Sequence, residues 1–261
     1  MKEDLALIIA AARAGGAVAL AHAKAGVKIR TKSDGTPVTD GDEAVDRLLF
    51  DTLTAARPDY GWLSEETVDD PLRLRTERQF IVDPIDGTAA YMKGKPWYVV
   101  SIAVVEAGQT VAGVLYAPAL DELYEATPGD GAWLNGQRIR ASQATALEGA
   151  GMLGDAPMFA HPSWPTPWPA MRIEKRNAIA YRMALVASGA FDAALALSAK
   201  RDWDLAAASL ICAEAGAIVT DHRGGELAFN SSHASIPSLI CAAPGLHSQI
   251  LARTSFIRLP N

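Results

Sequence analysis

The chain contains few of the residues from which thiol or histidine chemistry is built. It has two cysteines and five histidines among 261 residues, with no C-x-x-C spacing and no histidine cluster. This excludes a disulfide framework and argues against a zinc or copper site. Cys212 and Cys241 lie in apolar surroundings, so we expect buried thiols in a reducing compartment.

Long runs of one charge are also missing. The net charge is −6, and acidic and basic residues are mixed along the chain. This composition does not favour a nucleic-acid polymer or a membrane surface as partner. A Walker-type glycine-rich loop is absent as well, which argues against a phosphoryl-transferring kinase.

The apolar segment from Leu5 to Ala25 lacks the features of a secretory signal. Glu3 and Asp4 precede it and Arg13 interrupts it, whereas a signal peptide has a basic start and an unbroken apolar centre. Its apolar residues follow a helical period, which predicts a helix packed on a core. We therefore expect a cytoplasmic protein without transmembrane segments.

The pattern of predicted elements changes near residue 143. Residues 1–142 read as two helices followed by an antiparallel sheet, and residues 143–261 as alternating strands and helices. The predicted fold combines α+β and α/β parts in a layered αβαβα sandwich, with an N-terminal domain (1–142) and a C-terminal domain (143–261). Residues 156–169 carry five prolines and two tryptophans, which we expect to exclude regular structure and to form a lid, a subunit contact or an ordinary loop.

The stretch FIVDPIDGTAAY, residues 80–91, is the centre of the predicted site. A buried strand ends at Asp83 and Asp86, and Gly87 and Thr88 add bared amides and a hydroxyl. In isolation D-P-x-D-G is typical of an ordinary turn. Hard cations, however, prefer carboxylate and carbonyl oxygens, so the same residues could hold Mg²⁺ and present a phosphate to it.

Other acidic residues gain weight beside this stretch. Glu65 and Glu66 end a short apolar run, and Asp204 opens a helix, where a helix cap is the alternative role. Lys32 and Asp42 stand in a polar loop; Thr39 with Asp42 resembles a capping box. If these acids converge, their repulsion requires cations, and ligation by oxygen alone favours Mg²⁺ or Mn²⁺.

Five motifs in order carry a resemblance to a known family. They are PVTDGD (37–42), SEE (64–66), DPIDGT (83–88), GDGAWLNGQRI (129–139) and WDLAAASLICAEAG (203–216). Together they resemble the inositol monophosphatase superfamily of Mg²⁺-dependent, lithium-sensitive phosphatases over almost the whole chain. Ala217 departs from the usual continuation EAGG, at a helix end.

The resemblance implies a set of site residues. Glu65, Asp83 and the Ile85 carbonyl would hold one Mg²⁺, and Asp83, Asp86 and Asp204 a second. A third ion near Glu65 and Glu66 is possible, and Mn²⁺ could substitute. Gly87 and Thr88 amides would bind the substrate phosphate, and Glu65 with the Thr88 hydroxyl would activate the attacking water. Asp86→Asn is expected to abolish turnover and to leave the fold intact.

The substrate predicted from this resemblance is a small phosphorylated metabolite. Leu197 stands where inositol-specific members carry an acid, while Lys200 and Arg201 could meet a second phosphate unless they are solvated or pair with Asp202. We therefore expect the bisphosphate nucleotidase-like branch, with 3′-phosphoadenosine 5′-phosphate as substrate. Inositol 1-phosphate and fructose 1,6-bisphosphate are the alternatives, a non-catalytic binding relative is the competing class, and a homodimer is possible.

Overall fold

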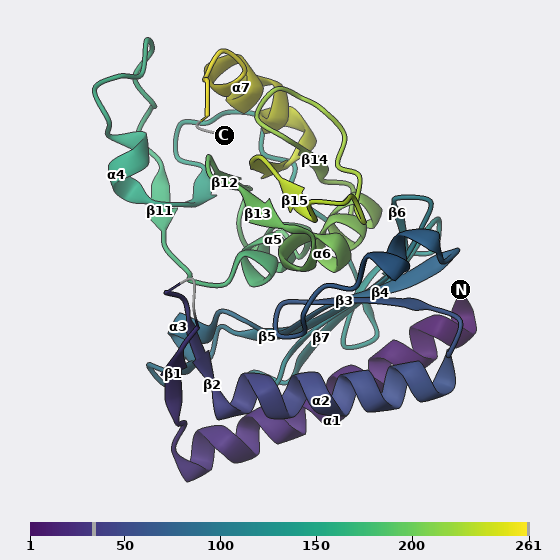
Figure 1. The fold of residues 1–261 in the computed structure, drawn as a ribbon. Coiled ribbons are helices and arrows are strands. Elements are labelled where there is room, and N and C mark those ends of the chain that lie inside the picture. The colour runs from purple at the N-terminus through teal and green to yellow at the C-terminus, as the bar shows by residue number, and fades with distance from the viewer. Residues whose placement is uncertain (33–34, 260–261) are drawn as a thin grey trace.

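The computed structural model describes residues 1–32 and 35–259, which form five alternating layers of helices and sheets (Figure 1). Helices α1 (Lys2–Ala25) and α2 (Asp40–Ala56) form the first layer, and a seven-stranded sheet forms the second. Helices α5 (Ile179–Ala187) and α6 (Asp202–Glu214) separate that sheet from a five-stranded sheet, which α7 (Pro244–Thr254) covers. The predicted αβαβα sandwich is confirmed.

The seven-stranded sheet has the order β3-β4-β5-β6-β7-β8-β9. Its strands are β3 (Gly61–Ser64), β4 (Arg78–Asp86), β5 (Val99–Glu106), β6 (Gln109–Ala117), β7 (Glu122–Thr127), β8 (Gly131–Leu134) and β9 (Gln137–Ile139). All neighbours are antiparallel except β3 and β4, which are parallel. The prediction of a fully antiparallel sheet is wrong at this edge, because the connection between β3 and β4 is a crossover through a 3₁₀ helix, η1 (Pro71–Arg75), and not a hairpin.

The five-stranded sheet is mixed and has the order β11-β10-β12-β16-β14. Its strands are β10 (Gly151–Leu153), β11 (Arg172–Glu174), β12 (Ala193–Ala196), β14 (Ile218–Thr220) and β16 (Leu239–Ala242). Two short pairs, β1 (Ile29–Thr31) with β2 (Pro37–Thr39) and β13 (Lys200–Arg201) with β15 (Ser235–Ile236), complete the strands. The two large sheets lie on either side of residue 142, but the division into domains there stays a prediction.

Three apolar clusters fill the spaces between the layers. One lies between α1, α2 and the seven-stranded sheet, a second between that sheet and α5 and α6, and a third between the five-stranded sheet and α7. Strand β4 is central and covered on both faces, so its apolar run is nearly unbroken. Close approach of the layers depends on small residues: an added Cβ at Gly113 of β6 would lie 2.9 Å from the Ala207 carbonyl oxygen of α6.

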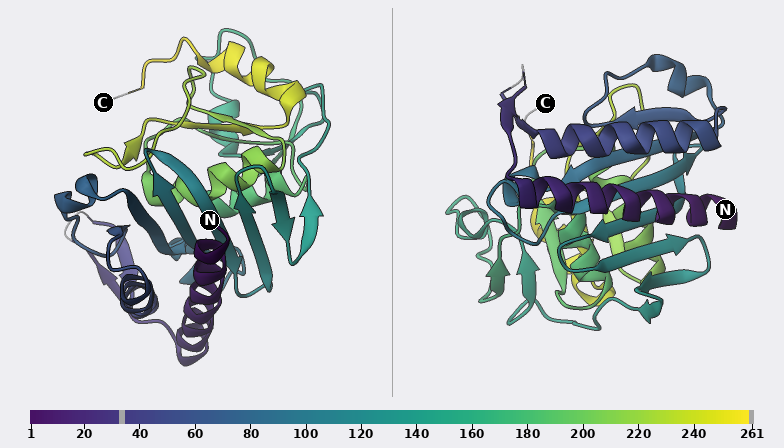
Figure 2. Two further views of the ribbon diagram at one scale, coloured as in Figure 1. Left: turned by 90° about the vertical axis from the view of Figure 1, so that its right-hand side faces the viewer. Right: turned by 90° about the horizontal axis from the view of Figure 1, so that it is seen from below.

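Helix α1 is long and apolar enough, by length and composition alone, to cross a membrane. Core helices pass the same test, and α1 turns a face of small and apolar residues towards the sheet, including Ile8, Ala12 and Gly16. It lies antiparallel beside α2 across the seven-stranded sheet (Figure 2). These contacts match the packed helix that the periodicity predicts.

One short helix corrects the prediction for the proline-rich segment. Ala156–Phe159 forms a short helix, α4, within residues 156–169. Pro157 is compatible with it because a residue in the first helical turn needs no intrahelical N–H bond. Trp164 and Trp168 pack edge to face in the remaining loop, 5.3 Å between ring centroids.

Candidate active site

Three carboxylates meet where β4 ends. Oxygen atoms of Asp83, Asp86 and Asp204 lie within 4.8 Å of one another. On a regular strand residues three apart point to opposite faces. Here the pairing shifts between Asp83, opposite Ser101, and Asp86, opposite Val99, so β4 carries one extra residue. This bulge, at Pro84, which cannot donate to the sheet, brings both carboxylates to one side.

Asp204 reaches the cluster from the first turn of α6, which follows β13. Its Oδ2 atom accepts a hydrogen bond from the Arg201 N–H at 2.8 Å, so the side chain both faces the helix start and joins the cluster. The alternative role as a helix cap is confirmed in part: Arg201 is the N-cap residue, and Asp204 caps the helix from the third helical position of a capping box. Helix α6 thereby connects the two halves of the chain at the site.

Asp86 is bound to the start of α5 as well. Its carboxylate accepts hydrogen bonds from the N–H groups of Ile179 (3.1 Å), Ala180 (2.8 Å) and Tyr181 (3.4 Å). The first N–H groups of a helix have no intrahelical partner and favour an anion. Asp86 therefore positions α5 in addition to joining the cluster, a role that the sequence alone did not reveal.

Burial makes the clustered carboxylates hard to ionise. Desolvation raises the pKa of Asp83 well above its usual range, and the nearby Glu65 and Asp86 charges add to this. Desolvation and the Asp204 charge raise the pKa of Asp86, and desolvation raises the pKa of Asp204 to about 6. Asp83 is 2% exposed, and within the described residues its carboxylate accepts one hydrogen bond, from the Ile85 N–H at 3.0 Å. At neutral pH, ionisation of this cluster therefore requires bound cations to compensate its negative charge.

Glu65 and Glu66, directly after β3, both bind Lys32. The Lys32 Nζ atom lies 3.1 Å from Glu65 Oε1 and 2.8 Å from Glu66 Oε1. Glu65 is near enough to Asp83 and Asp204 to raise their pKa values, but within the described residues it is not part of the group that meets within 4.8 Å. Lys32 is the cation that faces Glu65 in this arrangement.

Asp42 and Thr88 form a second polar unit next to β4. The Thr88 hydroxyl donates to Asp42 Oδ1 at 3.0 Å and lies 3.3 Å from the Ile85 carbonyl oxygen. Asp42 also accepts from the Thr39 N–H at 2.8 Å, within the capping box at the start of α2. The predicted capping box is confirmed, and the same side chain also contacts Thr88.

Gly87 occupies a conformation and a space that suit glycine alone. Its φ of 99° is left-handed, and an added Cβ would lie 2.8 Å from Ala178 Cβ. Gly87 precedes the short helix α3 (Thr88–Tyr91), whose first N–H groups have no intrahelical partner. The backbone here therefore approaches the loop before α5 closely and leaves amides available.

A cavity of about 560 Å³ lies beside the cluster, with Asp86 and Asp204 among its lining residues. Three basic side chains, Lys175, Arg182 and Lys200, line it, together with Leu197. Arg201, the other predicted phosphate-binding residue, does not line this cavity. Its guanidinium donates to the His233 carbonyl oxygen at 3.1 Å and lies 5.6 Å from the centre of the Trp203 ring.

Several residues of this cavity were not found by sequence reasoning. They are Asp155, Met158, Lys175, Asn177 and Arg182. Asp155 lies just before the proline-rich segment 156–169, and Met158 lies near its start. The basic run Lys175-Arg176 just before α5 was the available signal for the others.

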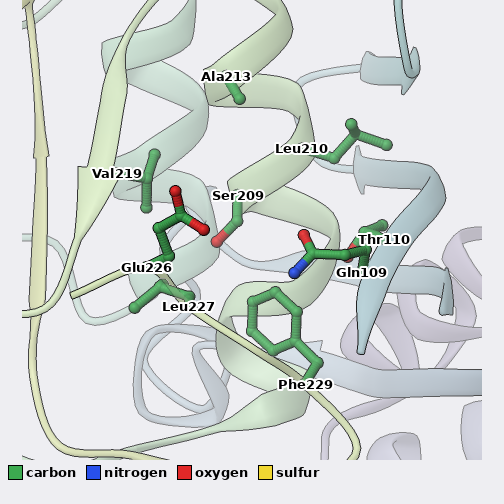
Figure 3. A pocket seen from close by; sticks show the side chains of 9 residues that line it. All are labelled: Gln109, Thr110, Ser209, Leu210, Ala213, Val219, Glu226, Leu227 and Phe229. Atoms are coloured by element: carbon green, nitrogen blue, oxygen red, sulfur yellow. The ribbon is translucent and has the colours of Figure 1, made fainter. Parts of the chain in front are cut away.

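A separate cavity of about 330 Å³ lies between α6, the start of β6 and residues 226–229 (Figure 3). One carboxylate, that of Glu226, faces it, with polar groups from Gln109 and Ser209 and with apolar side chains such as Phe229. No basic side chain lines it among the described residues. It therefore lacks both the carboxylate cluster and the cations found beside Asp86.

Comparisons with known proteins define first the class of protein. The chain is 35% identical over 212 residues to an inositol-1-monophosphatase of Mesorhizobium japonicum, with 77% of each chain covered. It is 35% identical over 199 residues to a fructose-1,6-bisphosphatase/inositol-1-monophosphatase of Thermotoga maritima, covering 72% of this chain and 73% of the relative. It is also 30% identical over 254 residues to the Nus factor SuhB of Pasteurella multocida, covering 94% and 92%. The class is that of metal-dependent phosphoric monoester hydrolases.

The profile of the inositol monophosphatase family matches residues 1–258, and the chain belongs to this family. The fold agrees: the Thermotoga maritima IMPase TM1415 superposes with a TM-score of 0.83 at 28% identity, covering 97% of this chain and 96% of that chain. The suhB protein of Bartonella henselae superposes with a TM-score of 0.84 at 27% identity, covering 97% and 99%. Members of the family are Mg²⁺-dependent phosphatases, and the acidic cluster is suited to a hard cation.

Proposed function

We propose that the protein is a bisphosphate nucleotidase: a phosphatase that removes one phosphate from a small metabolite carrying a second anionic group, with 3′-phosphoadenosine 5′-phosphate converted to AMP as the leading reaction. The observation that carries this proposal is the cavity whose lining includes Asp86 and Asp204 together with the basic side chains of Lys175, Arg182 and Lys200. Such a cavity suits a substrate with one phosphate to cleave and another to hold.

The residues fit the ions that the family uses. Asp83, Asp86 and Asp204 supply oxygen ligands within 4.8 Å of one another. Their pKa values are raised because ionising all three is unfavourable without a compensating charge, which a divalent ion would supply. We propose that Glu65, Asp83 and the Ile85 carbonyl hold one Mg²⁺ and that Asp83, Asp86 and Asp204 hold another. A third ion near Glu65 and Glu66, and Mn²⁺ as a substitute, belong to the same proposal.

The chain's own residues would position the reactants. When bound, Mg²⁺ neutralises the phosphate and makes water a better nucleophile. The Thr88 hydroxyl donates a hydrogen bond to Asp42, so the lone pairs of Thr88 Oγ1 are free to accept a hydrogen bond from an incoming water and orient it. Once its ion pair with Lys32 has opened, Glu65 would accept a proton from that water. The backbone amides of Gly87 and Thr88 would hold the scissile phosphate.

Inositol 1-phosphate and fructose 1,6-bisphosphate are the second candidates, because named relatives carry these activities in their names. The cavity favours neither polyol strongly. Leu197 gives it an apolar wall where a hydroxyl-binding acid would suit inositol. Fructose 1,6-bisphosphate shares the two phosphates of the leading substrate and would use the same basic side chains.

The setting of the protein is part of the proposal. We propose a cytoplasmic enzyme that acts on small metabolites, without a nucleic-acid polymer or a membrane as partner, and that forms a homodimer. The relatives named Nus factor SuhB make nucleic-acid association the competing class of function. The net charge of −6 and the absence of long basic runs argue for the enzyme.

A substrate panel tests the proposal. Phosphate release would be measured with 3′-phosphoadenosine 5′-phosphate, inositol 1-phosphate and fructose 1,6-bisphosphate, each with Mg²⁺ or EDTA and with or without lithium. We expect Mg²⁺-dependent, lithium-inhibited release with the first substrate preferred. A preference for inositol 1-phosphate would reject the nucleotidase assignment, and no release from any substrate would favour a non-catalytic relative.

A further inference from the structure

Arg182 is partly buried and, unlike Arg57, Arg73 and Arg78, has no ion-pair partner among the described residues. Arg73 pairs with Asp69, and Arg57 and Arg78 both pair with Asp4, at 2.6 to 3.0 Å. Within the described residues no carboxylate lies within ion-pair distance of Arg182. The one hydrogen bond found for its guanidinium runs from Nε to the Arg176 carbonyl oxygen. An arginine without a counter-ion is costly to bury.

The two terminal nitrogens of Arg182 are available to a ligand. Nε is fixed by the Arg176 carbonyl, which sets the plane of the guanidinium, and Arg182 lines the cavity beside Asp86 and Asp204. Neither terminal nitrogen is among the buried polar atoms that lack a partner in the described residues. They therefore reach open space, and a guanidinium presents paired N–H groups that match two phosphate oxygens. Burial lowers the pKa of Arg182, and the nearby charges of Asp86 and Asp155 oppose this effect only in part.

Lys200 adds a second positive charge to the lining of this cavity. Its ammonium donates to neutral acceptors, Ser198 Oγ at 2.8 Å and the Ala199 carbonyl oxygen at 3.1 Å. Lys175, by contrast, pairs with Asp155 at 2.9 Å, so its charge is already offset. Two cations without an ion-pair partner, Arg182 and Lys200, thus share a cavity with Asp86 and Asp204, while the third carboxylate of its lining, Asp155, pairs with Lys175.

We infer that Arg182, assisted by Lys200, forms a subsite for the non-scissile phosphate of the substrate and thereby sets the preference for bisphosphorylated over monophosphorylated metabolites. This inference rests on the proposed function. It also orients the substrate: the phosphate to be cleaved would lie at the carboxylate cluster of Asp86 and Asp204, and the second phosphate would contact the side chains of Arg182 and Lys200. Arg182 replaces Arg201 as the arginine of this subsite, because Arg201 does not line the cavity.

A structural role for Arg182 makes a different prediction. If Arg182 served only to hold the Arg176 carbonyl or to offset the charge of Asp86, its loss would affect every substrate in proportion. A phosphate-binding role instead affects substrates that carry the second phosphate and leaves matched monophosphates unchanged. The comparison of matched substrates therefore separates the two roles.

The test compares 3′-phosphoadenosine 5′-phosphate with adenosine 3′-phosphate, which lacks the second phosphate. In Mg²⁺, we expect the wild-type protein to prefer the bisphosphate in kcat/KM by about 10- to 100-fold, the range of one charged hydrogen-bond pair. Arg182→Gln should abolish this preference, mainly by raising KM for the bisphosphate, and should leave adenosine 3′-phosphate within about twofold. Arg182→Lys should keep part of the preference, since lysine keeps the positive charge but lacks the paired N–H groups of the guanidinium.

A matched control and a second readout guard against a folding defect. Arg47, an exposed arginine of α2 away from the cavity, supplies the control variant Arg47→Gln, which should behave as wild type. AMP carries only the non-scissile phosphate, so its inhibition of adenosine 3′-phosphate hydrolysis reports on the subsite alone. Arg182→Gln should raise the inhibition constant of AMP about tenfold or more.

The outcomes separate this inference from the function on which it rests. Equal turnover of both nucleotides by the wild-type protein, or an equal loss for both in Arg182→Gln, overturns the subsite and leaves the phosphatase in place. If neither nucleotide is cleaved, fructose 1,6-bisphosphate and fructose 1-phosphate are compared in the same way to test the subsite. Absence of Mg²⁺-dependent release from all four substrates rejects the proposed function and the subsite with it.

Discussion

Asp83 occupies the most demanding environment in the site. It is almost fully buried, its one identified hydrogen-bond donor is a neighbouring backbone N–H, and two further aspartates lie within 4.8 Å. Burial of an ionised carboxylate is unfavourable unless a charge of opposite sign compensates. Retaining this cluster in the metal-free protein therefore costs stability, which yields predictions that do not depend on knowing the substrate.

Asp83→Asn should separate activity from stability. The amide oxygen can still accept from the Ile85 N–H, while the negative charge disappears. We expect Mg²⁺-dependent phosphate release to fall by about 1,000-fold, because a shared ligand of both proposed ions loses its charge. The melting temperature of the metal-free protein at pH 8 should stay equal or rise. A marked drop in that temperature would show that Asp83 is needed for folding and not for cation binding.

The raised pKa values predict how stability depends on pH. In the metal-free folded protein Asp204 keeps its proton up to a pKa of about 6, and the pKa values of Asp83 and Asp86 are raised as well. The unfolded chain releases these protons near pH 4. The folded state then holds more protons than the unfolded state, so stability falls as pH rises from about 4 through the folded-state pKa values.

Calorimetry with and without Mg²⁺ checks this sign. The increase in melting temperature caused by Mg²⁺ should be several degrees at pH 8 and close to zero at pH 5, where protons compete for the cluster. Asp83→Asn should reduce the increase at pH 8. An equal effect of Mg²⁺ at both pH values would mean that the ion binds elsewhere.

Helix α6 is the element that carries Asp204 to the cluster, and its position depends on Gly113. An added Cβ at Gly113 would press on backbone atoms of Ala207, one turn after Asp204. We expect Gly113→Ala to destabilise the protein by about 1–3 kcal/mol and to raise the dissociation constant for Mg²⁺ about tenfold. Both are measurable by calorimetry.

Gly16→Ala is the matched control for this prediction. An added Cβ there would lie 2.6 Å from the Tyr116 ring, so α1 would be displaced from the opposite face of the same sheet. The loss of stability should be similar, but Mg²⁺ affinity should stay within about twofold, because α1 carries no residue of the site. Equal losses of affinity would show that the effect of Gly113→Ala is a general loosening.

At the scale of elements, the sequence predicts what local pattern and burial decide. The apolar run before Asp83, the capping box of Thr39 with Asp42 and the helix that begins near Trp203 are all confirmed. Local patterns could not reveal the bulge that aligns Asp83 with Asp86, because it depends on pairing with β5. They also missed α4, where Pro157 marks a helix start and not an irregular loop.

Long-range contacts of the site were beyond prediction for the same reason. The hydrogen bonds of Asp86 to α5 and the place of Arg182 in the cavity join residues about 95 positions apart in the chain. Lys200 and Arg201 are neighbours in sequence, yet only Lys200 lines the cavity. Which of these two residues lines the cavity depends on how β13 and the start of α6 place them, and not on residue type.

In the whole molecule, Asp86 joins the two sheets. It ends β4 of one sheet and accepts three N–H groups from α5, which packs against the other sheet. The prediction that Asp86→Asn leaves the fold intact is therefore revised: we now expect this variant to be less stable. An amide has one acceptor oxygen, and its NH₂ group would face N–H donors.

Asp86→Asn should consequently lose both activity and stability. We expect it to unfold with about 2 kcal/mol less free energy than Asp83→Asn at pH 7 without metal, measured by urea denaturation. Each variant removes one charge from the same cluster, so the difference isolates the contact with α5. Equal stability of the two variants would mean that this contact does not hold the layers together.

The most direct test of the central claim is phosphate release by the wild-type protein and Asp83→Asn, side by side, with 3′-phosphoadenosine 5′-phosphate in Mg²⁺ and in EDTA. We predict release by the wild-type protein in Mg²⁺ alone, and none above background by the variant. Release that persists in EDTA, or a variant as active as the wild type, would contradict a metal-dependent phosphatase built on this cluster.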